Sequence, residues 1–250
     1  MADFDNRLVR GATTVADTMD TGLRAHMLRV YNYMVGALAL TGAVAWLVAN
    51  TPALYNSLFH EVMTANGYTQ SPTLLGWVVM LAPLAMVFLL SYRIMQMSQQ
   101  AAQATFWVYA AMVGASLAYI LKLYTGASVA MTFFVTAATF GAMSLWGYTT
   151  KRDLTGMGNF LFMGLIGILI AMVANFFFKS PAIDFVVSVL GVLIFTGLTA
   201  WDTQKIKNTY YAVGGDVAVA GKAAIMGALA LYLDFLNIFL FLLRFLGNRR

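Results

Sequence analysis

Two segments near the end of the chain decide the fold: GLTAWDTQKIK (residues 197–207) and ALALYLDFLNIF (residues 228–239). Each segment places one aspartate, Asp202 or Asp234, inside a long apolar run. A charged aspartate near the centre of a membrane costs roughly 2.5–3.5 kcal/mol on insertion scales, so a membrane helix that keeps one usually gives it a partner or a function. Because the two runs are neighbours in sequence, each aspartate is expected to be the partner of the other.

The composition is that of a polytopic membrane protein. Of 250 residues, 61% are hydrophobic and 10% are charged, whereas a soluble domain has roughly 25% charged residues. The absence of cysteine excludes disulfides, thiolate metal sites and cysteine nucleophiles. The net charge of +5 is spread singly or in pairs beside apolar runs, which is typical of topology and headgroup charges and argues against nucleic acid as a partner.

Seven apolar runs approach the roughly 20 residues that a helix needs to cross a bilayer. We therefore predict an all-α polytopic fold with seven transmembrane helices and no separate soluble domain. A retained, polar N-terminal tail (residues 1–29) precedes a seven-helix transmembrane domain (residues 30–250), and short connections make sequence neighbours antiparallel. The expected spans are residues 30–50, 74–96, 104–124, 128–149, 157–178, 183–206 and 223–246.

The distribution of basic residues predicts a cytoplasmic N-terminus. With that orientation, ten of the fifteen Lys and Arg residues fall on the inner side, as the positive-inside rule requires. The C-terminal Arg249 and Arg250 then lie outside, unless the last run is re-entrant. The ten inner residues are Arg7, Arg10, Arg24, Arg29, Arg93, Lys151, Arg152, Lys205, Lys207 and Lys222.

The two aspartates are expected at similar depths. Asp202 lies about 9 residues before, and Asp234 about 13 residues after, the polar connection at 211–221, which is about 13 and 20 Å along two helices. Two carboxylates in contact at low dielectric share one proton and titrate as a unit. The alternative is that each is satisfied separately: Asp202 by water or Lys205, and Asp234 by Tyr232 or Asn237.

Three further polar features have a functional and a structural interpretation. Asn237 lies one helical turn after Asp234 and extends the same polar face. Arg93, near the inner end of the second span, either reaches the aspartates as an ion-pair partner or extends to the lipid headgroups. His60 and Glu61, in the outer loop at 51–73, are too few for a structural metal site, so we interpret them as part of a solvated loop.

These motifs, together with GYTTKRDL (residues 147–154), resemble the bacterial branch of the Bax inhibitor-1 family. The resemblance implies seven helices with the last one central and surrounded by the other six. It also implies a pH-sensitive calcium leak, with Asp202 and Asp234 as a proton-sharing sensor and calcium ligands, and Arg93 as a latch. One departure is that residues 76–92 contain no acidic residue, whereas some members carry a glutamate in this helix.

The intramembrane aspartates are compatible with three functions: an ion leak, a regulator of another membrane protein, and an intramembrane protease. The leading hypothesis is a calcium leak of the bacterial inner membrane, with calcium as the transported ion and no cofactor. The alternative is a regulator or partner of a membrane-bound quality-control protease, held through the tail at residues 1–29. An intramembrane aspartyl protease is disfavoured because the second motif, Tyr232-Leu-Asp234, lacks the Gly-x-Gly-Asp pattern expected there, so we do not expect an enzyme.

Overall fold

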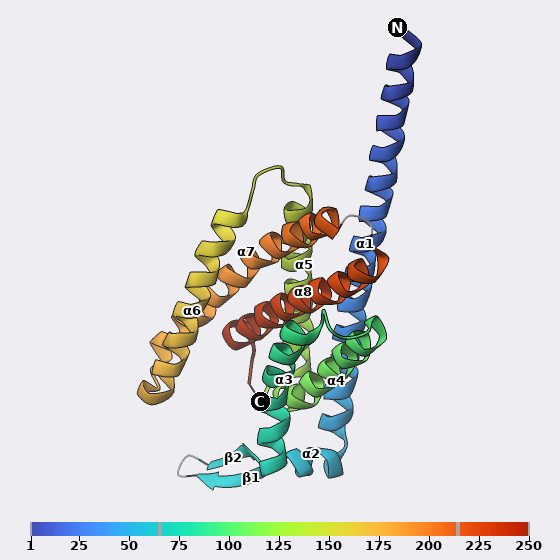
Figure 1. Cartoon of the computed structure of the whole chain (residues 1–250). Coiled ribbons are helices and arrows are strands. Elements are labelled where there is room, and N and C mark those ends of the chain that lie inside the picture. Colours follow the sequence, from blue (N-terminus) through green and yellow to red (C-terminus); the bar gives the residue numbers. More distant parts are fainter. Residues whose placement is uncertain (1, 65–66, 214–215, 250) are drawn as a thin grey trace.

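The computed structural model describes residues 2–64, 67–213 and 216–249, with side chains described outside residues 2–20, 64, 67–69 and 217. The described chain is almost entirely helical, with one short antiparallel hairpin at one end (Figure 1). Its elements in chain order are α1 (Ala2–Asn50), α2 (Pro52–Leu58), β1 (Phe59–Thr64), β2 (Gly67–Pro72), α3 (Leu74–Arg93), α4 (Gln99–Leu123), α5 (Gly126–Thr149), α6 (Thr155–Phe178), α7 (Pro181–Val213) and α8 (Val217–Leu246).

Seven of the helices are long and apolar enough to span a membrane, which confirms the predicted all-α polytopic class. They lie where the apolar runs are, and several of them begin with a capping side chain. Thr73, Ser98 and Thr125 each accept a hydrogen bond from the backbone N–H three residues later, which satisfies a donor that the helix itself leaves unpaired. The connections from α3 to α4 and from α4 to α5 are short, so these neighbouring helices run antiparallel.

The first and sixth spans are longer than predicted. The apolar part of α1 is described from Thr21 rather than from residue 30, and α7 continues to Val213. Leu23 and Met27 are buried in the main core cluster, so the second half of the expected tail (residues 21–29) packs as helix. Its first half, residues 1–20, lies outside the residues whose side chains are described.

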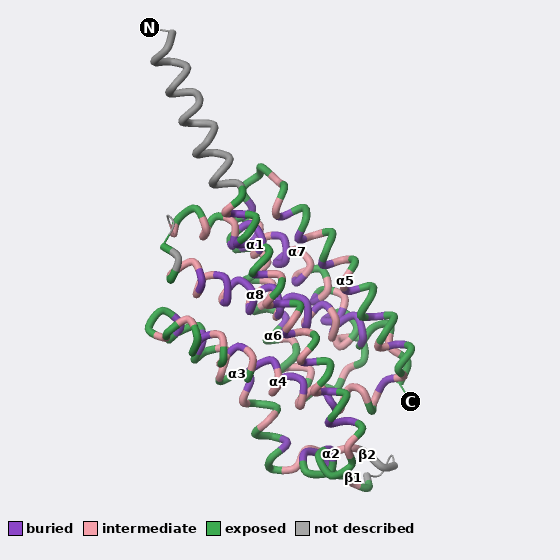
Figure 2. Tube along the Cα trace, turned by 90° about the vertical axis from the view of Figure 1, so that its right-hand side faces the viewer, coloured by how far each residue is buried: buried purple, intermediate pink, exposed green. Residues whose placement is uncertain are grey.

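The last helix, α8, is the centre of the bundle. Two-thirds of its membrane-length apolar window is buried, against one-third or less in every other span, and the buried colour is concentrated along it (Figure 2). It packs on α7, α1, α5 and α4, while α3 and α6 pack on α4 and α7. The central position expected for the last span is thereby confirmed.

The contacts of α8 show that it crosses the whole bundle. Near its start, the Lys222 Nζ donates to the Met95 carbonyl beside the α3–α4 connection (2.8 Å). After its end, Thr125 N donates to the Asn248 carbonyl (3.1 Å) and Asn248 N donates to Ser128 Oγ (3.0 Å), both beside the α4–α5 connection. Because α4 joins these two places, α8 is a complete span and not a re-entrant segment.

We name the two ends of the bundle by the predicted orientation. The inner end holds the connections at residues 94–98 and 150–154, and the outer end holds α2 and the hairpin. The connection between α5 and α6 and the hairpin lie at opposite ends of Figure 1. The segment predicted as a solvated loop, residues 51–73, forms α2, β1 and β2 in its described parts. The segment is held in place by apolar contacts, because Tyr55, Leu58 and Phe59 are buried in one cluster with Ala118 of α4. It therefore covers the outer ends of α1 and α4.

Candidate functional site

The structure brings the carboxyl groups of Asp202 and Asp234 within hydrogen-bonding reach of each other. Asp202 lies on α7 and is half-buried, whereas Asp234 lies on α8 with 4% of its surface exposed. The contact arises because α7 and α8 are antiparallel neighbours that share the most extensive helix–helix contact of the bundle. Apart from this carboxyl contact, Asp234 Oδ2 has no hydrogen-bond partner within the described chain.

Charges around the two aspartates are few. Lys205, one turn after Asp202 on α7, is the cation that attracts the Asp202 carboxylate electrostatically. The Lys205 Nζ lies 4.9 Å from the centre of the Trp201 ring. The charged group that interacts electrostatically with Asp234 is the Asp202 carboxylate. Two negative charges in contact away from water repel strongly, whereas one proton between them forms a hydrogen bond. The sharing of one proton between Asp202 and Asp234 therefore stays a prediction, which their adjacency makes chemically reasonable.

The residues proposed to satisfy Asp234 separately are engaged elsewhere. The Tyr232 hydroxyl is hydrogen-bonded to Thr41 Oγ1 on α1 (2.7 Å), and Asn237 Nδ2 donates to the Leu233 carbonyl of its own helix (2.8 Å). Asn237 lies one turn from Asp234, but its amide donor is used by the backbone. Asp234 is thus left with Asp202 as its neighbour.

A row of hydroxyl groups next to Asp202 is not apparent from the sequence. Thr203 Oγ1 donates to the Thr199 carbonyl (2.7 Å) and is hydrogen-bonded to Ser144 Oγ on α5 (2.9 Å). Ser144 Oγ is in turn hydrogen-bonded to the Tyr31 hydroxyl on α1 (2.6 Å). This row joins α7, α5 and α1 beside Asp202, and Tyr31 and Ser144 line a cavity of about 460 Å³.

Comparison with known proteins finds a matching family and several relatives. The family model described as "Inhibitor of apoptosis-promoting Bax1" matches residues 23–250. The chain belongs to the Bax inhibitor-1 family. Relatives in this family include the inner membrane protein YbhL of Escherichia coli, which is 47% identical over 92% of this chain and 94% of its own length. An uncharacterized protein of Rickettsia prowazekii is 47% identical over the full length of both chains, and one of Caulobacter vibrioides is 44% identical over the same extent.

Arg93, the latch that the Bax inhibitor-1 resemblance implies, lies apart from the aspartates in this structure. It is exposed in the last turn of α3 and makes no ion pair with any residue that the structure describes. The charged groups that act on Asp202 and Asp234 are each other and Lys205. The latch therefore stays a prediction, and in this structure Arg93 is exposed, as the alternative of extension to the lipid headgroups expects.

The segment GYTTKRDL (residues 147–154) contains the end of α5 and the inner connection to α6. Gln204 of α7 closes it: its Oε1 accepts from Leu154 N (2.8 Å) and its Nε2 donates to the Arg152 carbonyl (2.7 Å). Asp153 Oδ1 accepts from the side-chain hydroxyl and the backbone N–H of Thr155, and these two hydrogen bonds hold the pKa of Asp153 below its usual value. The segment is thus held to α7 at Gln204, two residues beyond Asp202.

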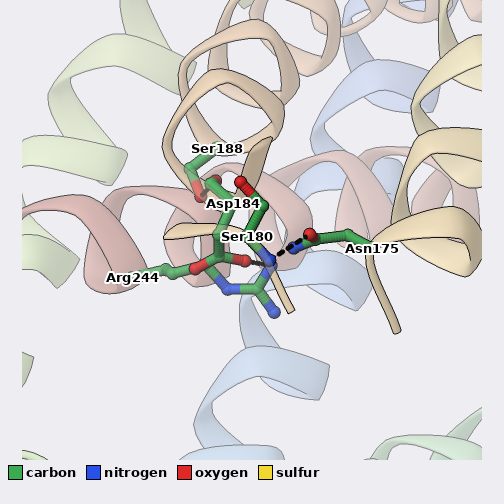
Figure 3. Close-up of polar contacts among 5 residues, drawn as sticks. All are labelled: Asn175, Ser180, Asp184, Ser188 and Arg244. Carbon is green, nitrogen blue, oxygen red and sulfur yellow. Dashed lines mark hydrogen bonds and ion pairs between the residues drawn. The ribbon is translucent and has the colours of Figure 1, made fainter. Parts of the chain in front are cut away.

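A second polar cluster fixes α6, α7 and α8 at the outer end (Figure 3). Arg244 of α8 forms an ion pair with Asp184 of α7 (3.1 Å). Asn175 Oδ1 accepts from Ser180 N in the α6–α7 connection (2.9 Å), and Ser188 Oγ donates to the Asp184 carbonyl (2.7 Å). The pair is nearly half exposed, so it contributes little stability by itself.

The protein ligands available to a metal ion are sparse. Across the described ranges, no three His, Asp or Glu side chains gather at one place. Calcium takes six to eight oxygen ligands in proteins, and Asp202 and Asp234 together supply part of such a set. The two carboxylates therefore suit an ion that keeps part of its water shell rather than one that is held permanently.

Proposed function

We propose that this Bax inhibitor-1 family protein is a pH-sensitive calcium leak of the bacterial inner membrane, gated by proton sharing between Asp202 and Asp234. The observation that carries the proposal is the contact between these two carboxyl groups on the central helix and its neighbour. Ionisable residues inside a membrane are costly and usually mark ion or proton pathways. The name of the relative YbhL, an inner membrane protein, supports the location.

The shared proton supplies the switch. With one proton between them, the carboxyl groups attract each other and hold α7 against α8. Without it, two negative charges lie side by side at low dielectric, and their repulsion favours separation of the helices or the entry of a cation. Since α8 contacts α1, α4, α5 and α7, a shift of α8 changes the packing of the whole bundle.

Calcium fits the chemistry of this pair. It is a hard cation that prefers carboxylate and water oxygens, and the proton competes with it for the same oxygens. A site of two carboxylates binds the ion weakly enough to release it, as conduction requires. Lys205, which acts on Asp202 from the inner end, opposes accumulation of cations and limits the rate.

The test is calcium flux into proteoliposomes that contain the full chain, measured across the physiological pH range. Asp202→Asn and Asp234→Asn each remove a titrating group while keeping side-chain size. In either variant we expect the change in calcium flux across this pH range to be several-fold smaller than in the native protein.

The matched control is Asp184→Asn, which removes a carboxylate at the outer end, away from the pair. We expect it to keep the native pH profile. A native profile in Asp234→Asn would refute proton gating by the pair, and an absence of calcium flux in the native protein at every pH would refute the leak itself.

A further inference from the structure

A polar pocket of about 1010 Å³ lies at the outer end of the bundle, and neither Asp202 nor Asp234 lines it. Its walls come from the end of α1, from α2, from the hairpin and from the last turns of α4. The residues that line it are Ala49, Asn50, Pro52, Tyr55, Asn56, Phe59, His60, Glu61, Gln70, Tyr119, Lys122 and Leu123. The pocket therefore joins segments that are distant in sequence, as a binding site does.

Two opposite charges line this pocket without pairing. Lys122 places its Nζ 5.5 Å from the centre of the Tyr55 ring, and Glu61 Oε1 accepts from Gln70 Nε2 (3.1 Å). Neither Lys122 nor Glu61 forms an ion pair within the described ranges, where the ion pair present is that of Asp184 and Arg244. Opposite charges that face one pocket without neutralising each other fit a ligand that carries both an anionic and a cationic group.

The pocket also holds a buried donor. Tyr55 is 6% exposed, and its hydroxyl has no hydrogen-bond partner in the part of the chain that is described. Burial, followed by Tyr119 and Glu61, raises the pKa of Tyr55, so the phenol stays protonated and can donate. An unpaired buried hydroxyl is unfavourable, and a polar group bound beside it would supply the missing partner.

The wall behind this donor is rigid and aromatic. The Tyr55 and Phe59 rings lie 5.1 Å apart, and the Phe59 and Tyr119 rings 5.9 Å apart, measured between ring centres. Such a wall holds its shape while a ligand binds, and the faces of the tyrosine rings attract an ammonium group. His60 and the amides of Asn50 and Asn56 add donors and acceptors around the rim.

The position of the pocket indicates where its ligand comes from. It opens where the spanning helices α1 and α4 end, at Asn50 and Leu123. Trp46 and Leu47, one turn before the end of α1, are exposed apolar residues, and tryptophan is enriched at the membrane–water boundary. The pocket is thus at the depth of the lipid headgroups.

We propose that this pocket binds a phosphoethanolamine group, with the phosphate at Lys122 and the ammonium at Glu61. The group has the two charges that the pocket matches, and at this depth it is presented by a phospholipid headgroup or by a soluble phosphoethanolamine compound. Nothing in this assignment depends on the aspartate pair or on calcium transport.

The first experiment is calorimetric titration of the detergent-solubilised full chain with sn-glycero-3-phosphoethanolamine. Glu61→Gln and Lys122→Gln each remove one charge, and each should weaken binding roughly tenfold or more, because a charge-assisted hydrogen bond is lost. Lys179→Gln, an exposed lysine at the same end but outside the pocket, should bind like the native chain. Because both target side chains are exposed, neither substitution should destabilise the fold. Unchanged melting temperatures check that the variants remain folded.

The second experiment separates the two sources. Native mass spectrometry measures retention of phosphatidylethanolamine against phosphatidylglycerol in the same four proteins. Retention of phosphatidylethanolamine that is lost in both pocket variants supports a lipid ligand, and titration without such retention supports a soluble one. Failure of the native chain to bind either form, or native binding by Glu61→Gln, overturns the proposal.

Discussion

Gln204 joins parts of the chain that are 50 residues apart in sequence. Its amide both accepts from Leu154 N and donates to the Arg152 carbonyl, so one side chain satisfies a donor and an acceptor in a connection that has no helix of its own. Leu154 is buried, and water does not replace that partner easily. At the scale of the residue, Gln204 fixes α7 to the α5–α6 connection, two residues beyond Asp202.

We predict that Gln204→Leu destabilises the protein by about 1–3 kcal/mol, because it leaves the buried Leu154 N–H unpaired. The measurement is the melting temperature in detergent. Asn208→Ala, on an exposed residue of the same helix, is the control and should change stability by less than about 0.5 kcal/mol. Equal melting temperatures for the two variants would show that the connection does not depend on Gln204.

The aspartates could be predicted from sequence because a charge inside an apolar run is a rare and costly signal. The hydroxyls of Ser144, Thr203 and Tyr31 could not, since serine, threonine and tyrosine occur in many spans without consequence. Their hydrogen bonds depend on how α1, α5 and α7 are placed in space. The same reason explains Arg93, whose reach depends on where α3 ends relative to α8.

Gly147 determines how closely α5 approaches α7. A Cβ at this position would overlap the Ala200 carbonyl and lie 2.8 Å from Ala200 Cα, and these are backbone atoms that a rotamer change does not move. At Gly141, on the same helix, an added Cβ would meet nothing within 4 Å. At the scale of the element, close packing of α5 on α7 therefore requires glycine at one position and not at the other.

We predict that Gly147→Ala costs about 1–3 kcal/mol of stability, as overpacking of a well-packed contact does. Gly141→Ala is the matched control and should be neutral or stabilising by up to about 1 kcal/mol, because alanine favours a helix over glycine. Thermal unfolding of both variants in detergent measures the difference. Similar melting temperatures for the two variants would mean that α7 shifts away from α5 without loss of stability.

The spanning helices could be predicted from sequence because the thickness of a bilayer sets their length and apolarity. The hairpin of β1 and β2 could not, since it lies outside the membrane and no apolar pattern of spanning length marks it. It forms where Phe59 at its start is buried against α4. The pocket at Glu61 and Lys122 was missed for the same reason: the two residues meet only after the hairpin folds onto α4.

At the scale of the whole molecule, the connections divide the surface into two sides. Gln96 and Arg152 are exposed in connections at the inner end, whereas Lys179 and Asn248 are exposed at the outer end. The basic residues are concentrated on the first side, which predicts that this side faces the cytoplasm.

Single cysteines test this orientation, since the natural sequence contains none. We predict that a membrane-impermeant maleimide labels Lys179→Cys and Asn248→Cys in intact cells, and labels Gln96→Cys and Arg152→Cys only after permeabilisation. Labelling of all four in the reverse order would reverse the orientation. Protection of Asn248→Cys together with Arg152→Cys would contradict the complete crossing of α8.

The central position of α8 also bears on how the protein is made. The helix that fills the middle of the bundle is the last of the spanning helices to leave the ribosome. The six earlier helices include pairs that pack without it, such as α1 on α4 and α6 on α7, but the contacts that join these pairs through α8 form only when it arrives. Because α8 also brings Asp234 next to Asp202, its arrival gives the half-buried carboxylate of α7 its neighbour.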